Sequence, residues 1–328
     1  MPKTITLPPY LSARSADDTV AVCGLLLEGG GAVLVDASRL KFADPFGLAM
    51  LGATFQMLRD VERTVQVCGL GAAAAGYLGR MDVFEGVERV DCGPPANQRH
   101  NRGDSLVELT RLDTPQEVDQ AAYRLAHALV GHLPGIDPDE PPDEMSGYTT
   151  FDRLVEPIQY ALSELLENAL THARGHGFAH ASVWVASQHY PSSGIIRLGV
   201  VDNGCGILAS LRGHPELKHE RHLEAILAAL QPRVSCNRDL RLNLESVNQG
   251  VGLTTTCRIA EHAGGRLVIV SGDARHDTAG KSGELAGHAY WQGTAIALEC
   301  RRVGLPDIRY RELLPAYEGQ YRPGLRFE

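Results

Sequence analysis

The stretch VVDNGCGI, residues 200–207, decides the fold, because it joins an apolar strand to a polar corner rich in glycine. Val200 and Val201 are β-branched and typical of a buried strand, and the ionisable Asp202 follows them directly. Gly204 and Gly206 come next, two residues apart. Taken alone, such an Asn-Gly run indicates a hairpin turn. It gains a functional interpretation only if other segments supply complementary groups.

Composition limits the class of protein. A chain of 328 residues is long for one core, so we expect two domains. The 31 Lys and Arg against 40 Asp and Glu give a net charge of −9, and no dense basic run occurs, which disfavours nucleic-acid binding. The seven scattered cysteines indicate reduced thiols. With neither a signal-peptide core nor an apolar run of ~20 residues, the sequence predicts a cytoplasmic protein that does not enter the membrane.

The first part of the chain alternates between strand and helix patterns. Residues 32–36 and 65–70 have strand character, and residues 45–61 and 72–81 carry apolar side chains at helical spacing. This pattern predicts a small α/β unit. Residues 93–95, GPP, end this unit, and the polar residues 97–104 that follow predict a linker.

The second part predicts helices over a mostly antiparallel sheet, in two layers. Residues 106–112, LVELTRL, predict a strand, and the helix after it has a start signal in Thr114, Pro115 and Glu117. The acidic, proline-rich residues 135–147 predict an exposed loop. The remaining predicted elements are a helix over 150–173, strands near 181–187 and 195–201, a helix within 208–249, a helix over 253–262, and strands near 266–271 and 290–300.

The long helix over 150–173 carries a polar stripe. Glu164, Asn168 and His172 lie four residues apart and border the apolar face. Glu164 suits a general base, and the amide oxygen of Asn168 suits Mg²⁺, which keeps most of its waters and also binds phosphate. An ordinary solvated flank is the alternative for any one of these residues, and His172 alone fits a packing or capping role.

A second glycine pair, Gly250 and Gly252, immediately precedes the helix over 253–262. Free N–H groups and the positive end of the helix dipole favour a phosphate there. A flexible loop before a helix start is the alternative. Asp202 supplies what this segment lacks, since a carboxylate can accept a hydrogen bond from an exocyclic amine such as that of adenine. We expect Gly204 and Gly206 to leave room for the flat base.

The order of these segments resembles the GHKL ATP-binding family, which includes gyrase B subunits, Hsp90, MutL, histidine kinases and anti-sigma-factor serine kinases. The boxes are SELLENALTHA, VVDNGCGI, GVGL and WQGTAIALEC. The matching residues are Glu164 and Asn168 in the first box, Asp202, Gly204 and Gly206 in the second, Gly250, Val251, Gly252 and Leu253 in the third, and Gly293 and Thr294 in the last. The resemblance implies a Bergerat-type α/β sandwich that binds ATP with Mg²⁺. It implies that Glu164 is the catalytic residue, that Asn168 holds the metal, and that the other matching residues contact ATP. It also implies a mobile lid over 208–249.

Within that family the chain is most similar to the anti-sigma serine kinases, because LVELTRLDTPQEVDQAAYRLAHAL resembles the strand and helix that open them. The gyrase, chaperone and MutL branches carry a further domain, whereas about 26 residues follow Arg302 here. His127 sits on a short helix without the acidic residue and proline usual near a phosphoacceptor histidine. We therefore expect neither the gyrase, chaperone and MutL branches nor a histidine kinase.

Residues 1–98 resemble a STAS domain, the fold of anti-sigma-factor antagonists. AVLVDASRLKFADPFGLAML follows the pattern of strand, aspartate, turn and helix, but Asp44, Pro45, Phe46 and Gly47 replace the D-S-S-G turn of phosphorylatable members. Both serines are missing, so the resemblance implies a scaffold or docking role. An unrelated small α/β domain is the alternative.

These inferences predict an α+β chain with a STAS-like domain at 1–98, a linker at 99–103, a GHKL ATP-binding domain at 104–302 and a tail at 303–328. The predicted function is an ATP-binding regulator in signal transduction with Mg²⁺-dependent ATPase or protein kinase activity. The alternative is a nucleotide-gated interaction module with negligible turnover. Either function implies a protein partner or protein substrate and no nucleic acid or membrane, and leaves a homodimer open.

Overall fold

The fold is of mixed α and β type, as the sequence predicts, with a parallel sheet followed by an antiparallel one. The computed structural model of the protein describes residues 2–92, 106–131, 133, 135–137, 139–232, 234 and 252–307. Within these ranges, no helix has both the length and the apolar character needed to cross a membrane.

The N-terminal unit, residues 2–92, is built on four parallel strands in the order β1-β3-β5-β6, which helices connect. The two strands and two helices predicted here are confirmed as β3, β5, α2 and α3. The other elements were not predicted. The bounds are β1 Lys3–Thr6, β2 Tyr10–Leu11, η1 Ala13–Ser15, α1 Ala16–Leu27, β3 Val33–Asp36, β4 Phe42–Ala43, α2 Pro45–Asp60, β5 Val65–Cys68, α3 Ala72–Arg80 and β6 Glu88–Val90.

Helix α2 is the central helix of this unit. Asp44 caps its start, since the carboxylate Oδ1 accepts a 3.1 Å hydrogen bond from the amide of Gly47, and Pro45 occupies the first helical position. Every residue from Pro45 to Phe55 is buried. A helix that is apolar on all sides needs neighbours on all sides, and α2 has them in the N-terminal unit and in the second sheet.

The second sheet has seven strands, all antiparallel, in the order β12-β11-β10-β13-β9-β8-β7. Asp202, the last residue of β9, lies opposite Val183 on β8. The strands that the sequence predicts near 106–112, 181–187, 195–201, 266–271 and 290–300 are confirmed. The bounds are β7 Leu106–Leu112, β8 Val183–Tyr190, β9 Ile195–Asp202, β10 Arg266–Gly272, β11 Ala274–Asp277, β12 Gly283–Glu284 and β13 Trp291–Arg301.

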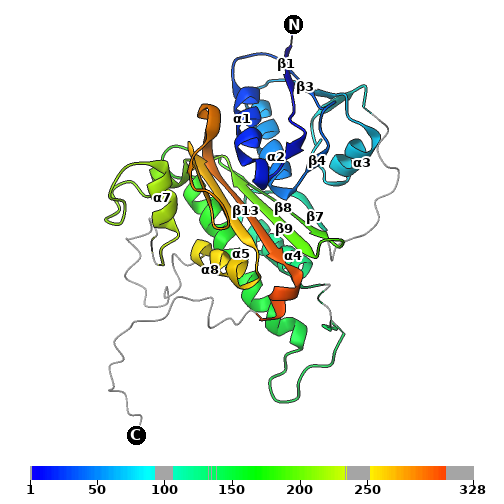
Figure 1. The fold of residues 1–328 in the computed structure, drawn as a ribbon, viewed down its shortest axis with the longest axis vertical. Helices are drawn as coiled ribbons and strands as arrows, with labels where there is room; N and C mark the ends of the chain where they lie inside the picture. Colours follow the sequence, from blue (N-terminus) through cyan, green and yellow to red (C-terminus); the bar gives the residue numbers. More distant parts are fainter. Residues whose placement is uncertain are drawn as a thin grey trace.

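Helices cover one face of this sheet (Figure 1). Two of them start at full capping boxes, Thr114 with Glu117 and Thr149 with Asp152, so the start signal read in the sequence at Thr114 is confirmed. The loop predicted over 135–147 is exposed where the structure describes it. The bounds are α4 Pro115–Val130, α5 Thr150–Ala173, α6 Gly206–Ser210, α7 His222–Ala229, α8 Gly252–His262, η2 Ala286–His288 and η3 Arg302–Asp307.

The N-terminal unit covers the opposite face of the sheet (Figure 1). Alternate residues of each strand enter different cores: Val200 packs under the helices, whereas Val201 packs against the N-terminal unit. The same alternation places Val185 in the first core and Trp184 in the second. Both faces of the sheet are therefore buried.

The junction between α2 and the sheet is close. At Gly199 on β9, a Cβ atom would overlap the backbone of Pro45, so only glycine allows this approach. Next to it, Arg197 lies 3.9 Å from the carboxylate of Asp44 and forms a 2.8 Å ion pair with Glu299. Burial raises the pKa of Asp44 to about 6. Residues 44–47, the turn singled out in the sequence, thus lie inside the molecule.

Parts of the predicted organisation fall outside the described residues. These are the linker at 99–103, the section of the predicted lid from 235 to 249, and the tail beyond Asp307. Residues 303–307, which we assigned to the tail, belong to η3, and Leu305 there is fully buried in the core beneath the helices.

Candidate functional site

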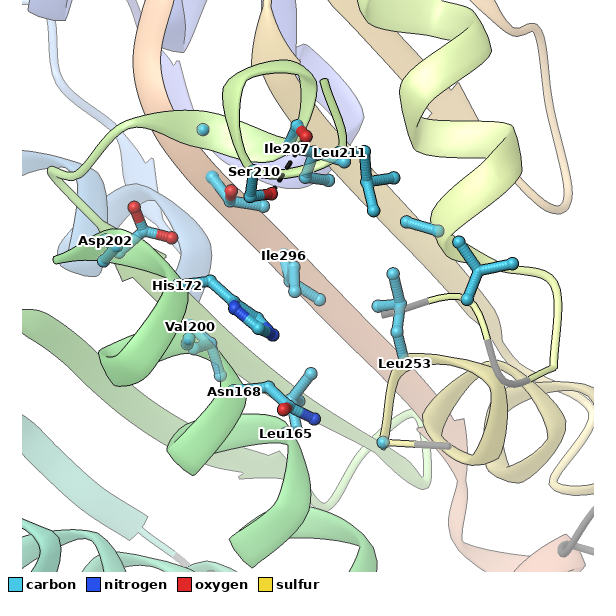
Figure 2. Close-up of a pocket in the computed structure, with 17 residues that line it drawn as sticks. Leu165, Asn168, His172, Val200, Asp202, Ile207, Ser210, Leu211, Leu253 and Ile296 are labelled. Atoms are coloured by element: carbon cyan, nitrogen blue, oxygen red, sulfur yellow. Dashed lines mark hydrogen bonds between the residues drawn. The ribbon is translucent and has the colours of Figure 1, made fainter. Parts of the chain in front are cut away.

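A pocket of about 110 Å³ opens between the sheet and helices α5, α6 and α8 (Figure 2). Its walls are mostly apolar with a few polar groups, the usual character of a small-molecule site. A cavity of roughly 150 Å³ holds benzene, so the space is of the order that one planar ring needs. The lining residues are Leu165, Asn168, Ala169, His172, Ala173, Val200, Asp202, Gly206, Ile207, Ser210, Leu211, Ala229, Val234, Gly252, Leu253, Thr294 and Ile296.

Asp202 is the buried carboxyl group of this pocket, with 4% of its surface exposed. Its Oδ1 accepts a 2.9 Å hydrogen bond from the amide of Gly204, and the amide and hydroxyl of Thr294 also donate to it. Burial raises the pKa of Asp202 to about 7, although these three donors oppose the rise. A ligand that brings a further N–H donor would favour the charged carboxylate.

The two glycines after Asp202 have a different purpose from the one we expected. A Cβ atom at Gly204 would overlap the backbone of Ala173 at the end of α5, and Gly204 does not line the pocket. Gly206 does line it, but it has a φ of +77° and lies against the carbonyl of Gln292, 2.6 Å from an added Cβ. Contact with neighbouring backbone, rather than space for a base, requires both glycines.

A buried serine ties this corner to the neighbouring strands. The hydroxyl of Ser271, at the end of β10, donates a 2.9 Å hydrogen bond to the carbonyl of Gly293 and accepts a 3.0 Å bond from the amide of Ile207. The start of α6 is thereby fixed to β13. The chain after Asp202 continues into this helix instead of turning back as a hairpin.

The polar stripe of α5 is only partly in the pocket. Asn168 and His172 line it, and burial lowers the pKa of His172, which favours the neutral ring. Glu164, one turn earlier, is half-buried and is not among the lining residues. Burial raises the pKa of Glu164, and the nearby charge of Glu167 raises it further.

The N-terminus of α8 meets α5 at this stripe. An added Cβ on Gly252 would lie 3.0 Å from the backbone of Glu164 and 3.1 Å from the Asn168 amide nitrogen. The first residue of α8 thus lies close to Asn168, and the N-terminal end of a helix favours an anion. Thr254 and Thr256 are buried and donate to the carbonyls of Leu230 and Gly252, so their hydroxyls stabilise the helix start.

Segments far apart in the sequence therefore converge on one pocket. Figure 2 shows Asp202, His172 and Asn168 along one side, Leu253 opposite them, and Ile296 between the two sides. Of the predicted site residues, the pocket is lined by Asn168, Asp202, Gly206, Gly252, Leu253 and Thr294. Glu164 and Gly204 are adjacent but do not line it, and Gly250 and Val251 lie outside the described residues.

Most of the apolar wall of the pocket was not predicted from the sequence. Val200 and Ile296 stand two residues from Asp202 and Thr294 on the same strands, so the two-residue period of a strand places them on the same face. That period is the signal that could have found them. Nothing local in the sequence marks Ser271, whose role depends on contacts with distant segments.

The fit of Mg²⁺ can be judged from the donor atoms. No group of three or more His, Cys, Asp or Glu side chains able to hold a metal occurs in the described part of the chain. Mg²⁺ does not require one, since it keeps several waters and is commonly held by one or two protein oxygens together with substrate phosphates. Asn168, whose side-chain amide lies beside the start of α8, supplies one oxygen for that mode.

Comparisons of the chain with protein-family models, curated proteins and solved structures returned no match.

Proposed function

We propose that the chain binds ATP with Mg²⁺ in this pocket and acts on its γ-phosphate, as a regulatory ATPase or protein kinase of the GHKL type. The observation that carries the proposal is the convergence of Asp202, Asn168 and Gly252 from three distant segments on one small, largely apolar pocket. A carboxylate for an amine, an amide oxygen for a cation and a helix start for phosphates are the groups that an adenine nucleotide needs.

The surroundings of these groups support the same ligand. Val200 and Ile296 give a planar base an apolar surface next to Asp202. The start of α8 approaches Asn168 at Gly252, so the phosphates would meet the helix start and the Mg²⁺ ligand close to each other. When bound, Mg²⁺ would neutralise phosphate charge, and Asn168 is the residue that would hold it.

The finer fold assignments are part of this proposal. An antiparallel sheet with α5 and α8 over its pocket supports a Bergerat-type domain. Parallel strands connected by helices support a STAS-like N-terminal unit. A cytoplasmic location and a protein partner or substrate go with a regulator of this kind.

Glu164 is the proposed general base, and its raised pKa suits the acceptance of a proton. The test is incubation of the full chain with γ-labelled ATP and Mg²⁺, with label counted on free phosphate and on protein. Glu164→Gln should abolish release or transfer. Glu156→Gln is the matched control, because Glu156 lies two turns earlier on α5 and is exposed.

A second function, a nucleotide-gated interaction module with negligible turnover, is favoured by one observation. The Glu164 side chain is set back from the pocket, whose Gly252 contacts its backbone. Calorimetry that finds tight Mg-ATP binding together with no labelled product would select this function. A finding that neither Mg-ATP nor Mg-ADP binds would refute both.

A further inference from the structure

Trp291, the first residue of β13, holds Asp202 from behind the pocket. Its indole Nε1 donates a 2.9 Å hydrogen bond to the backbone carbonyl of Asp202. The side chain is 2% exposed, does not line the pocket, and belongs to the core that the sheet shares with the N-terminal unit. Trp291 therefore contacts a pocket residue on one side and the interior of the N-terminal junction on the other.

The backbone around this hydrogen bond is irregular and tightly packed. Ser271 pairs with Thr294 but the next residue, Gly272, pairs with Trp291, so β13 has a bulge between these positions. Bulges redirect side chains and are frequent next to functional sites. Within the bulge, a Cβ atom at Gly293 would overlap the carbonyl of Asp202. The bulge thus sets the spacing between Trp291, Asp202 and Thr294.

The N-terminal unit packs directly on the segment that leads into Trp291. A Cβ atom added at Gly24 of α1 would lie 4.0 Å from the carbonyl oxygen of Tyr290, so α1 runs close to this segment. Asp17, at the start of α1, accepts a 3.1 Å hydrogen bond from the amide of Ala286. It also forms a 2.7 Å ion pair with Arg275. Helix α1 therefore fixes residues 286–290, and with them the position of Trp291.

We propose that Trp291 is a positioning residue for the pocket, and that through it the packing of the N-terminal unit fixes Asp202. This inference rests on the proposed function, in which Asp202 contacts the base. A buried carbonyl that loses its donor shifts toward another partner, and the carboxylate on the same residue moves with it. In the proposed complex a displaced carboxylate weakens its own hydrogen bond to the base, and the loss of a bond of that kind corresponds to about a tenfold change in affinity.

The chain offers a matched control, because it contains two tryptophans and both lie in the same core. Trp184 on β8 is 3% exposed and does not line the pocket. By calorimetry on the full chain, Trp291→Phe should bind Mg-ATP about tenfold more weakly. Trp184→Phe should bind it as the wild type does, with both variants checked for folding by circular dichroism.

Fluorescence provides a readout that a purely structural role would not change. Trp184→Phe retains only Trp291, whose emission should change when Mg-ATP is added. Trp291→Phe retains only Trp184, whose emission should stay constant. Wild-type affinity in Trp291→Phe, equal weakening in both variants, or an unresponsive Trp291 would overturn the inference. If Trp291→Phe does not fold, the emission of Trp184→Phe decides.

A third measurement separates failure of this inference from failure of the proposed function. If the wild type binds no ATP, the proposed function fails, but Trp291 still contacts a residue whose carboxyl has a pKa of about 7. In Trp184→Phe, the emission of Trp291 should then follow a transition near that pH, and Asp202→Asn in the same background should remove it. A pH-independent emission would refute the coupling without any nucleotide.

Discussion

Replacement of Asp202 by asparagine should stabilise the fold and weaken nucleotide binding. The carboxyl is buried, and burial raises its pKa to about 7 in the folded protein, compared with ~3.9 for an unfolded aspartate. The unfolded chain therefore loses this proton first as the pH rises. Stability is fully present below the unfolded pKa and falls until the pH passes the folded pKa.

The size of this effect follows from the shift. About three pKa units at ~1.4 kcal/mol each give roughly 4 kcal/mol for the ionised carboxylate at high pH. Between about pH 5.5 and pH 8, the wild type should lose roughly 2 kcal/mol relative to Asp202→Asn. Other titrating groups are common to both proteins, so they cancel in the difference, and an altered bond to Thr294 adds only a constant offset.

Nucleotide affinity should change in the opposite direction. A hydrogen bond to a charged group is worth about 1.5–3 kcal/mol, so Asp202→Asn should bind Mg-ATP on the order of 10 to 150 times more weakly above pH 7. Because the amine of the base favours the carboxylate, wild-type affinity should fall as the pH drops below about 7. The affinity of the variant should not depend on pH in this way.

Denaturant unfolding and calorimetry at matched pH values measure the two effects. A stability difference that does not change with pH would show that Asp202 is not a buried, shifted carboxyl. A gain in stability without loss of affinity would show that the carboxylate does not contact the ligand. Either result refutes the reasoning that links burial to binding at this residue.

Three further predictions concern the pocket and the junction. Asn168→Ala should remove most of the Mg²⁺ dependence of ATP affinity, because its amide is the proposed protein ligand, and calorimetry with and without Mg²⁺ tests this; an unchanged dependence would exclude that role. Gly293→Ala should cost more than about 2 kcal/mol of unfolding free energy in a denaturant assay, because the added Cβ overlaps the carbonyl of Asp202. Gly283→Ala, where an added Cβ meets open space, should be neutral in the same assay. Asp44→Asn keeps a good helix cap, and burial raises the pKa of Asp44 to about 6. The variant should therefore gain stability over the wild type as the pH rises from about 4 to about 7. A stability difference that stays constant over this range would contradict the prediction.

The predictable parts of the fold are those with a local cause. Thr114 with Glu117 marks a helix start within four residues, and the pattern of residues 150–173 predicts both ends of α5. Helix α1 was missed because it contains Gly24 and β-branched residues and carries apolar residues such as the exposed Leu25 outside its buried face, which weakens the amphipathic period.

The sequence predicts which residues lie at the candidate site better than it predicts what each of them contacts. Asp202, Asn168 and Gly252 stand out because polar residues or glycines interrupt apolar patterns. What Gly204 contacts could not be read from the sequence, because the Ala173 backbone comes from another segment. The covered second face of the sheet had a signal that we did not use: strands such as β10 are apolar at every position from Leu267 to Val270, as strands buried on both sides are.

The start of α2 is buried against Gly199, so any other protein that binds this surface of the sheet must displace the N-terminal unit. This requirement sets a minimum affinity for such a protein. The N-terminal unit is attached to the sheet by the chain itself, and units joined within one chain typically meet at an effective concentration on the order of millimolar. A free competitor at micromolar concentration would have to bind roughly a thousand times more tightly to displace it. Another protein could therefore bind this surface of the sheet only after some other event had weakened the packing of the N-terminal unit.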